Sequence, residues 1–268
     1  MGRDYEKRAD PLRHSRLRLG RARKRFIQLG KEVVGYVEGN QPRLDRRFDS
    51  ATGWTSYNLQ LRGGPRKQLA EGAGIICEDL RIALDLLVGA LRNGDQADTQ
   101  PPRFPICLTI DDYLGKKAAS GQRQRLLRGL ASPDLALIDA LQPYHRVDPA
   151  KDPLAQLQAV YDRYTKKELR GALVVSDVPS AEFEELESRS VRKAETRRCH
   201  SDVTARDNLE VLAYRIWPDP KARLKVDISV RFDLRFDPPG LTMSDLDRIR
   251  AQVEKTVRSF DTRLASVA

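Results

Sequence analysis

Apolar positions recur at the helical period near the start of the chain, immediately after Asp10-Pro11. An aspartate followed by proline is typical of a helix start, with the carboxylate as N-cap and the proline in the first turn. We expect this helix to end at Gly39-Asn40. The apolar stripe that defines the helix is narrow and consists of Leu12, Leu19, Phe26, Leu29, Val33 and Val37.

The next segment predicts a β-hairpin and then the most apolar helix of the chain. Residues 43–62 contain two strand-like runs that flank the turn-forming residues Ser50–Gly53. Residues 68–92 return to helical spacing, and Asn93-Gly94 is a typical end for that helix.

The period changes from helical to strand-like near Leu169. The clearest strand alternates apolar and polar residues up to Phe236, which is typical of an antiparallel strand with one solvated face. By contrast, the acidic run Glu182–Glu187 predicts a solvated helix or loop. Helices are expected at residues 110–117, 122–130, 133–141 and 154–168, and strands at residues 173–175, 191–196, 209–217 and 225–236.

A closing amphipathic helix follows Pro238-Pro239-Gly240, and we expect it to pack on the strand face. Helices followed by strands, without βαβ alternation, predict the α+β class. The expected architecture is a mostly helical N-terminal bundle with a small hairpin, followed by an antiparallel sheet and a C-terminal helix. The expected domains are residues 1–168 and 169–268, unless both form one continuous domain.

The excess positive charge lies in the first quarter of the chain. Residues 1–67 contain 17 Lys and Arg against 7 Asp and Glu, whereas the other 201 residues contain 31 of each sign. Between Pro11 and Lys31 there is no carboxylate. This asymmetry indicates a polyanionic partner such as nucleic acid, contacted by a cationic helix face that points outward without neutralising carboxylates. The alternative is a solvated face near acidic residues of the same fold. The candidate nucleic-acid-binding residues are Arg13, Arg16, Arg18, Arg21, Arg23, Lys24 and Arg25.

Other chemistry has few sequence signals. Cys77, Cys107 and Cys199 are widely spaced, which predicts neither a disulfide framework nor a cysteine-based zinc site. Phosphate-binding, dinucleotide-binding and zinc-protease motifs are lacking, so we expect no cofactor and no metal. The first residues lack the apolar core of a signal peptide, and no run approaches the roughly 18 apolar residues of a membrane span. We therefore expect a cytoplasmic protein without a membrane partner.

Charged residues interrupt the apolar helix at residues 68–92. Glu78, Arg81 and Asp85 fall on one side of that helix, at spacings that allow ion pairs. Three interpretations are open: a solvent-facing stripe, a buried ion network that fixes helix packing, and a functional site. These residues are the catalytic candidates, and whether the protein is an enzyme stays undecided.

Several short motifs occur in order along the chain. They are Leu80–Leu87 (LRIALDLL), Phe104-Pro105-Ile106, Leu141–Tyr144 (LQPY), Leu154–Leu157 (LAQL) and Asp162–Thr165 (DRYT). The chain thereby resembles an uncharacterised bacterial family that has a basic N-terminal helix and the pattern N-L-R-S-A-L-D-H, F-P-I, L-Q-P-Y and D-K-H-R. The arginine and histidine of that pattern are similar to the Arg-x4-6-His motif of HEPN-type ribonucleases, which are helical-bundle proteins of bacterial toxin and defence systems.

This resemblance implies that Arg81 acts on the phosphate or 2′-hydroxyl group of RNA. The chain departs from the pattern at both histidines: Leu86 stands at the first position, and Asp162–Thr165 contains none. Imidazole is the usual group for acid–base chemistry near neutral pH. An active nuclease would therefore need Arg81 and Asp85 to act with Glu78 or with a distant histidine.

Three functions follow as hypotheses. The first is a module that docks its basic helix on the backbone of RNA or DNA, because no aromatic side chain interleaves the arginines to stack on bases. The second is a divergent HEPN-like ribonuclease. The third is a protein-interaction or antitoxin-like component, which forms a homodimer or binds another protein through its closing helix and last strand.

Overall fold

A computed structural model describes residues 10–40, 42–61, 63–92, 101–115, 121–185, 191–201, 203–218 and 224–267. The chain forms two compact units, each assembled from separate segments. The helical unit consists of Met1–Leu29, Glu71–Leu169 and Met243–Ala268, and the strand unit consists of Gly30–Ala70 and Arg170–Thr242. The first two helices, α1 (Arg13–Gly39) and α2 (Lys67–Leu91), contribute residues to both units.

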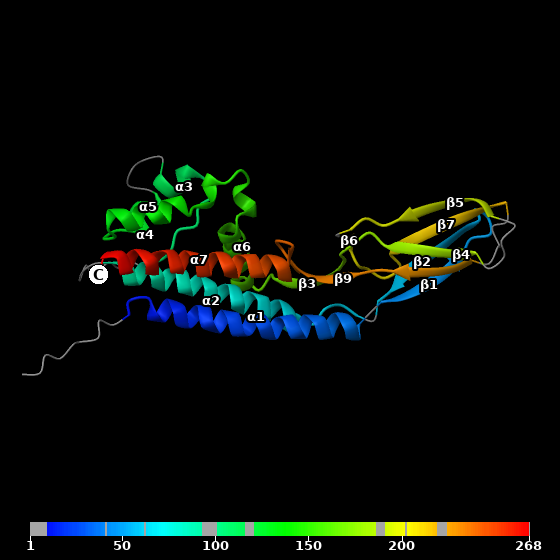
Figure 1. Ribbon diagram of the computed structural model, residues 1–268, viewed down its shortest axis with the longest axis horizontal. Helices are drawn as coiled ribbons and strands as arrows, with labels where there is room; N and C mark the ends of the chain where they lie inside the picture. Colours follow the sequence, from blue (N-terminus) through cyan, green and yellow to red (C-terminus); the bar gives the residue numbers. More distant parts are fainter. Residues whose placement is uncertain are drawn as a thin grey trace, which may run out of the picture. The chain divides into compact units, whose positions relative to one another are not determined.

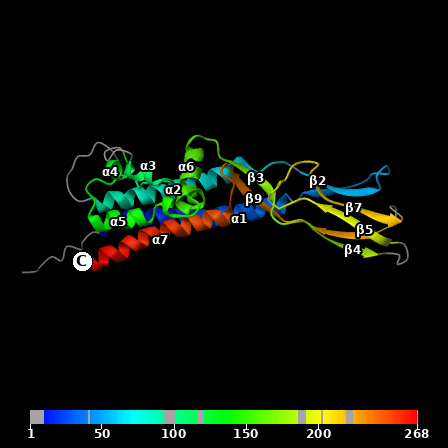
Figure 2. The same ribbon diagram turned by 90° about the horizontal axis from the view of Figure 1, so that it is seen from above.

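Three long helices build the core of the helical unit. Helix α7 (Met243–Val267) lies alongside α1 and α2 (Figures 1 and 2). Each presents an apolar stripe to the others, as the helical period predicts. The fully buried side chains of this core include Leu12, Leu80, Leu84, Leu87, Leu246, Ile249, Val253 and Phe260.

Four shorter helices complete the helical unit and begin at or next to the predicted starts of the short helices, but the second ends at residue 126 instead of 130 and the fourth at residue 165 instead of 168. They are α3 (Ile110–Leu114), α4 (Gln122–Leu126), α5 (Ser132–Ala140) and α6 (Pro153–Thr165), with 3-10 turns η1 (Pro143–His145) and η2 (Pro149–Lys151). The predicted end of the first short helix at Lys117 lies outside the described residues. Helix α6 starts where the Asp152 carboxylate accepts a hydrogen bond from the Leu154 N–H at 2.8 Å.

The strand unit contains three antiparallel arrangements. One four-stranded sheet has the order β1-β2-β7-β5, a second has the order β10-β9-β3-β6, and β4 pairs with β8. The strands are β1 (Arg43–Phe48), β2 (Trp54–Gln60), β3 (Arg170–Val175), β4 (Ser180–Glu185), β5 (Val191–Arg198), β6 (Val203–Thr204), β7 (Glu210–Pro218), β8 (Leu224–Ser229), β9 (Phe232–Asp237) and β10 (Leu241–Thr242). The α+β class is confirmed.

The predicted strand at residues 225–236 is two strands. It is interrupted after Ser229, so β8 pairs with β4 whereas β9 pairs with β3. Between β8 and β9, the carbonyl of Arg231 accepts a hydrogen bond from the Ser176 N–H at 2.9 Å. The alternation of side chains persists in β9, where Leu234 and Phe236 are fully buried. Alternation alone could not reveal the interruption, because both pairs of strands keep the same two-residue period.

The acidic run at Glu182 was expected to be a solvated helix or loop, and that prediction is wrong for its described part. Residues up to Glu185 form β4, whose backbone pairs with β8 along its whole length. Glutamate has low β-propensity, but strand pairing depends more on neighbouring strands than on intrinsic preference. Residues 186 and 187 lie outside the described residues.

The two units group the elements differently from the expected domains at residues 1–168 and 169–268. The hairpin of β1 and β2 belongs to the strand unit, because β2 pairs with β7 from Trp54 to Asn58. The closing helix α7 belongs to the helical unit, where it packs against α6 instead of on the strand face. One junction between the units follows Leu169, one residue after the expected boundary. No helix in the described part of the chain is long and apolar enough to cross a membrane.

Gly74 on α2 lies against Tyr164 on α6, where there is no space for a larger residue. A Cβ atom there would lie 2.1 Å from the Tyr164 ring, whereas a Cβ at Gly20 on α1 would meet no atom within 4 Å. We expect Gly74→Ala to lower the free energy of unfolding by about 1–3 kcal/mol through overpacking. Gly20→Ala should raise it by up to about 1 kcal/mol, because alanine favours the helix. Urea unfolding measures both changes, and equal stabilisation by the two variants would contradict the packing described here.

Candidate nucleic-acid interface

The seven candidate cations all lie on the part of α1 that belongs to the helical unit. The opposite face of this helix is buried through Leu12, Ser15, Leu19, Ala22 and Leu29. Six of the seven candidates are exposed, and Arg18 is half-buried at the border of the two faces. The helix therefore presents its basic residues outward, but not all of them are free.

A buried carboxylate on α2 engages two of the candidates. Asp79 is only 2 % exposed, and its Oδ1 accepts from Nη1 of Arg18 at 2.9 Å. Its other oxygen, Oδ2, accepts from Nη1 of Arg25. Arg18 and Arg25 are two helical turns apart and so lie on the same side of α1. Both guanidinium groups neutralise a charge inside the protein.

A third candidate, Arg16, is held by two carboxylates, one exposed and one half-buried. Its Nη2 pairs with Asp10 just before α1 and with Asp261 of α7, the latter at 3.3 Å. The expectation of a face without neutralising carboxylates is therefore wrong for Arg16, Arg18 and Arg25. The physical reason is that α1 packs on α2 and α7, which bring Asp79 and Asp261 from distant parts of the sequence, while Asp10 lies just before the acid-free stretch.

The other four candidates, Arg13, Arg21, Arg23 and Lys24, are exposed and form no ion pair within the described residues. We call them the four-cation set. Between Pro11 and Lys31 the helix carries no carboxylate that could neutralise them locally. The set therefore presents uncompensated positive charge to solvent.

A groove between α1 and α7 extends this cationic surface. It has a volume of about 270 Å³ and includes Arg23 from α1 and Arg258 from α7. The two carboxylates beside it are already paired, Asp261 with Arg16 at 3.3 Å and Glu254 with Arg250 at 2.6 Å. Arg258 is exposed and has no ion pair within the described residues. The groove is therefore a second place where an anion meets unpaired guanidinium groups.

The catalytic candidates on α2 are arranged as a clamp on a neighbouring loop. Arg81 is 7 % exposed, and its Nη2 donates to the carbonyl of Phe104 at 2.6 Å and pairs with Asp85 Oδ1 at 3.0 Å. Asp85 Oδ1 also accepts from the Phe104 N–H at 2.8 Å. The two side chains thus satisfy both backbone groups of one buried residue.

Burial dominates the electrostatics of this clamp. It lowers the pKa of the Arg81 guanidinium from its ordinary value, an effect that the Asp85 carboxylate opposes. It raises the pKa of Asp85, and Arg81 in turn opposes that shift. Of the three interpretations of the charged stripe, the geometry is that of the buried ion network. Glu78 is half-buried and lies outside this clamp. Burial raises the pKa of Tyr164 on α6, and the charge of Glu78 adds to that rise.

The LQPY motif holds the same loop from the other side. Gln142 is fully buried, and its Nε2 donates to the carbonyls of Pro105 and Ile138 at 3.1 and 3.0 Å. Its Oε1 accepts from the Cys107 N–H at 3.1 Å. The motifs around Arg81, Phe104 and Gln142 therefore meet on one short loop, whose backbone groups they satisfy. Tyr161 and Asp162 on α6, like Asp85, oppose the lowering of the Arg81 pKa by burial. The ribonuclease hypothesis stays a prediction.

Asp79 was missed as a functional residue by sequence reasoning. A signal was present: Ile75, Ile82 and Leu86 lie four, three and seven residues away, so this carboxylate shares a helix face with apolar residues. A charge in such a position is buried only with a partner, and the arginine-rich helix is an obvious source of one.

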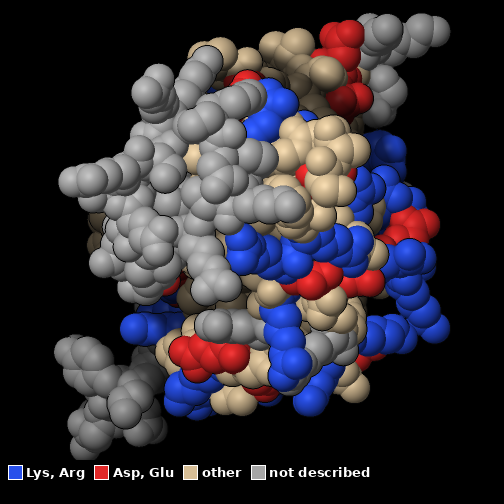
Figure 3. All heavy atoms as spheres, turned by 90° about the vertical axis from the view of Figure 1, so that its right-hand side faces the viewer, with Lys and Arg blue, Asp and Glu red and all other residues tan. Residues whose placement is uncertain are grey.

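Some arginines of the strand unit are paired, whereas others, among them Arg66 and Arg170, form no ion pair within the described residues. The guanidinium of Arg197 lies 4.1 Å from the centre of the Trp54 ring, and Arg215 lies 5.1 Å from it. Arg215 also pairs with Glu195 at 2.9 Å. Figure 3 shows basic and acidic side chains mixed on the face seen from the right-hand side of Figure 1.

Comparison with known proteins found no matching family model, curated protein or solved structure. Within the described ranges, no group of three or more His, Cys, Asp or Glu side chains is placed to hold a metal ion.

The clamp predicts strong coupling between Arg81 and Asp85. Asp85→Asn should lower the free energy of unfolding by about 3–5 kcal/mol, because it leaves a buried guanidinium without its counter-charge. Arg81→Met should cost about 1–3 kcal/mol, since Phe104 loses its donor. The double variant should be more stable than the sum of the single losses by at least about 1 kcal/mol. Denaturant unfolding of the four proteins measures this coupling, and strictly additive losses would contradict the clamp.

Proposed function

We propose that the helical unit binds nucleic acid through the phosphate backbone, with the four-cation set as its contact surface. The proposal is supported above all by the coexistence of Arg13, Arg21, Arg23 and Lys24 on one exposed helix segment without a free carboxylate. Arginine and lysine are the residues that neutralise phosphates in such complexes.

The dimensions of the helix suit an extended polyanion. From Arg13 to Lys24 the helix advances about 16 Å at about 1.5 Å per residue. A duplex carries about one negative charge per 1.7 Å of its axis, so several phosphates pass along this distance. Arg258 in the adjacent groove supplies a further cation from α7.

Recognition by this surface is expected to be independent of base sequence. The aromatic residue on this part of α1, Phe26, is half-buried, and the Arg250 guanidinium lies 5.6 Å from its ring centre. It therefore offers no open face for base stacking, on which sequence-tolerant binding of single strands often depends. Backbone contact alone gives affinity without base readout.

The salt dependence of binding tests the proposal. Four phosphate contacts give a slope of log K against log salt of about −3.6 on duplex DNA and about −2.8 on single strands. The triple variant Arg21→Gln, Arg23→Gln, Lys24→Gln should make the duplex slope shallower by about 2.7. Fluorescence anisotropy with mixed-sequence RNA and DNA at several salt concentrations measures these slopes.

A matched control removes three exposed cations elsewhere. Arg123, Arg125 and Arg128 lie in and just after α4 of the same unit, and each is exposed. Their replacement by glutamine changes the net charge equally but should leave the slope within about 0.5 of the wild-type value. An equal loss from both triple variants would reduce the effect to net charge and overturn the assignment of the surface.

A further inference from the structure

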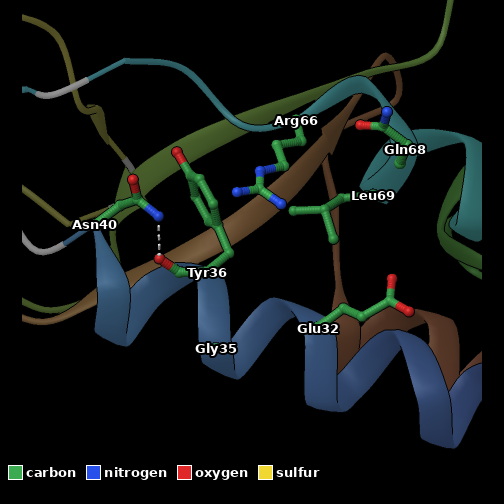
Figure 4. A pocket seen from close by; sticks show the side chains of 7 residues that line it. All are labelled: Glu32, Gly35, Tyr36, Asn40, Arg66, Gln68 and Leu69. Carbon is green, nitrogen blue, oxygen red and sulfur yellow. Dashed lines mark hydrogen bonds between the residues drawn. The ribbon is translucent and has the colours of Figure 1, made fainter.

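A cavity in the strand unit contains polar groups that the proposed function does not use. It has a volume of about 720 Å³, within the range of about 300–1,000 Å³ that is common for ligand sites. It is lined by the last turns of α1 and by the segment that enters α2 (Figure 4). The lining residues are Glu32, Gly35, Tyr36, Asn40, Arg66, Gln68 and Leu69.

The buried hydroxyl of Tyr36 lacks a partner. Tyr36 is 8 % exposed, and its hydroxyl oxygen is fully buried without a hydrogen bond to any described residue. Burial raises the pKa of this phenol, so it is a neutral hydrogen-bond donor at neutral pH. An unsatisfied buried hydroxyl costs about 1–3 kcal/mol, a cost that a bound acceptor removes.

A second donor lies beside the Tyr36 side chain. Arg66 is exposed and forms no ion pair or side-chain hydrogen bond within the described part of the chain. Figure 4 shows its guanidinium between the side chains of Tyr36 and Leu69. A guanidinium carries five N–H donors and no acceptor, in a geometry that fits a carboxylate or a phosphate. A charged donor and a neutral donor on the same cavity favour an oxyanion as the ligand.

The remaining walls limit the size and charge of the ligand. Leu69 is 4 % exposed and gives the cavity an apolar wall, and a Cβ atom at Gly35 would meet nothing within 4 Å. The Asn40 amide is occupied, because its Nδ2 donates to the Tyr36 carbonyl at 2.8 Å. Glu32 on the lining adds one negative charge, which disfavours ligands of high negative charge.

We propose that this cavity binds a small organic anion, whose carboxylate or phosphate group is held by the Arg66 guanidinium and the Tyr36 hydroxyl. The apolar part of the ligand lies over Gly35 and against Leu69. The site lies within the strand unit and is separate from the four-cation set, so its test does not depend on nucleic-acid binding.

Titration of the full-length protein with defined anions tests the site. Benzoate and inorganic phosphate are the probes, benzamide is the neutral analogue of benzoate, and chloride keeps the ionic strength constant. We expect benzoate, phosphate or both to raise the thermal midpoint with saturation, and benzamide to leave it unchanged. A shift with benzoate alone identifies a carboxylate site, and one with phosphate alone identifies a phosphate site. No saturable shift with either anion would overturn the proposal.

Two conservative variants assign the effect to the cavity. Arg66→Gln should weaken binding of the active anion at least about tenfold, because a charge-assisted bidentate contact is lost. Tyr36→Phe should weaken it about fivefold, while the free protein keeps or gains stability, because the unsatisfied hydroxyl is gone. Arg170→Gln is the matched control, since Arg170 is an exposed arginine of the same unit outside the lining. Binding that is equally weak in the control, or unchanged in both cavity variants, would overturn the assignment.

A third variant fills the space. Gly35→Leu places a side chain in the cavity without a steric clash at its Cβ atom and should abolish binding while the fold is kept. Gly39→Leu changes a glycine of the same helix that also has open space around it but does not line the cavity. Retained binding by Gly39→Leu and lost binding by Gly35→Leu would support the proposal, and the reverse would overturn it.

Discussion

The arrangement of the helical unit depends on the ion pairs that the Asp79 carboxylate forms with Arg18 and Arg25. A carboxylate that is only 2 % exposed is tolerable in a protein interior when opposite charges and hydrogen bonds compensate it. Arg18 and Arg25 supply both, from positions two turns apart on α1. Their spacing sets the rotation of this part of α1 about its own axis. That rotation directs Arg13, Arg21, Arg23 and Lys24 to solvent, so the internal ion network also determines the external cationic surface.

The same physical requirement organises the loop at Phe104. Buried backbone N–H and carbonyl groups need partners, and this loop lacks regular secondary structure to provide them. Arg81, Asp85 and Gln142 provide them instead, from α2 and from the end of α5. Short motifs at distant points of the chain therefore share one structural task. This explains the pattern LRIALDLL, FPI and LQPY without assigning catalysis to Arg81.

Local periodicity was sufficient to predict most elements, because helices and hairpins are specified by neighbouring residues. It predicted α1, α2, the short helices and the amphipathic closing helix near their observed positions. It could not predict the partner of α7, the interruption between β8 and β9, or the strand at Glu182, since these depend on pairing between distant segments. For the candidate site, composition located the basic helix, but only the packing of Asp79 and Asp261 separates engaged arginines from free ones. The cavity at Tyr36 and Arg66 had no sequence signal, because its walls come from two separate segments.

The variant Asp79→Asn is the most direct test of which cations of α1 serve the fold and which remain free for a ligand. Its stability and its nucleic-acid affinity are measured on the same preparation. We expect Asp79→Asn to lower the free energy of unfolding by about 2–3 kcal/mol, because both guanidinium groups lose their buried acceptor yet reach solvent. We also expect an undiminished affinity for mixed-sequence duplex, with a salt slope that is steeper by up to about 1.8 because two arginines are released. An unfolding free energy within about 0.5 kcal/mol of the wild-type value, together with weakened binding, would overturn the role given to Asp79.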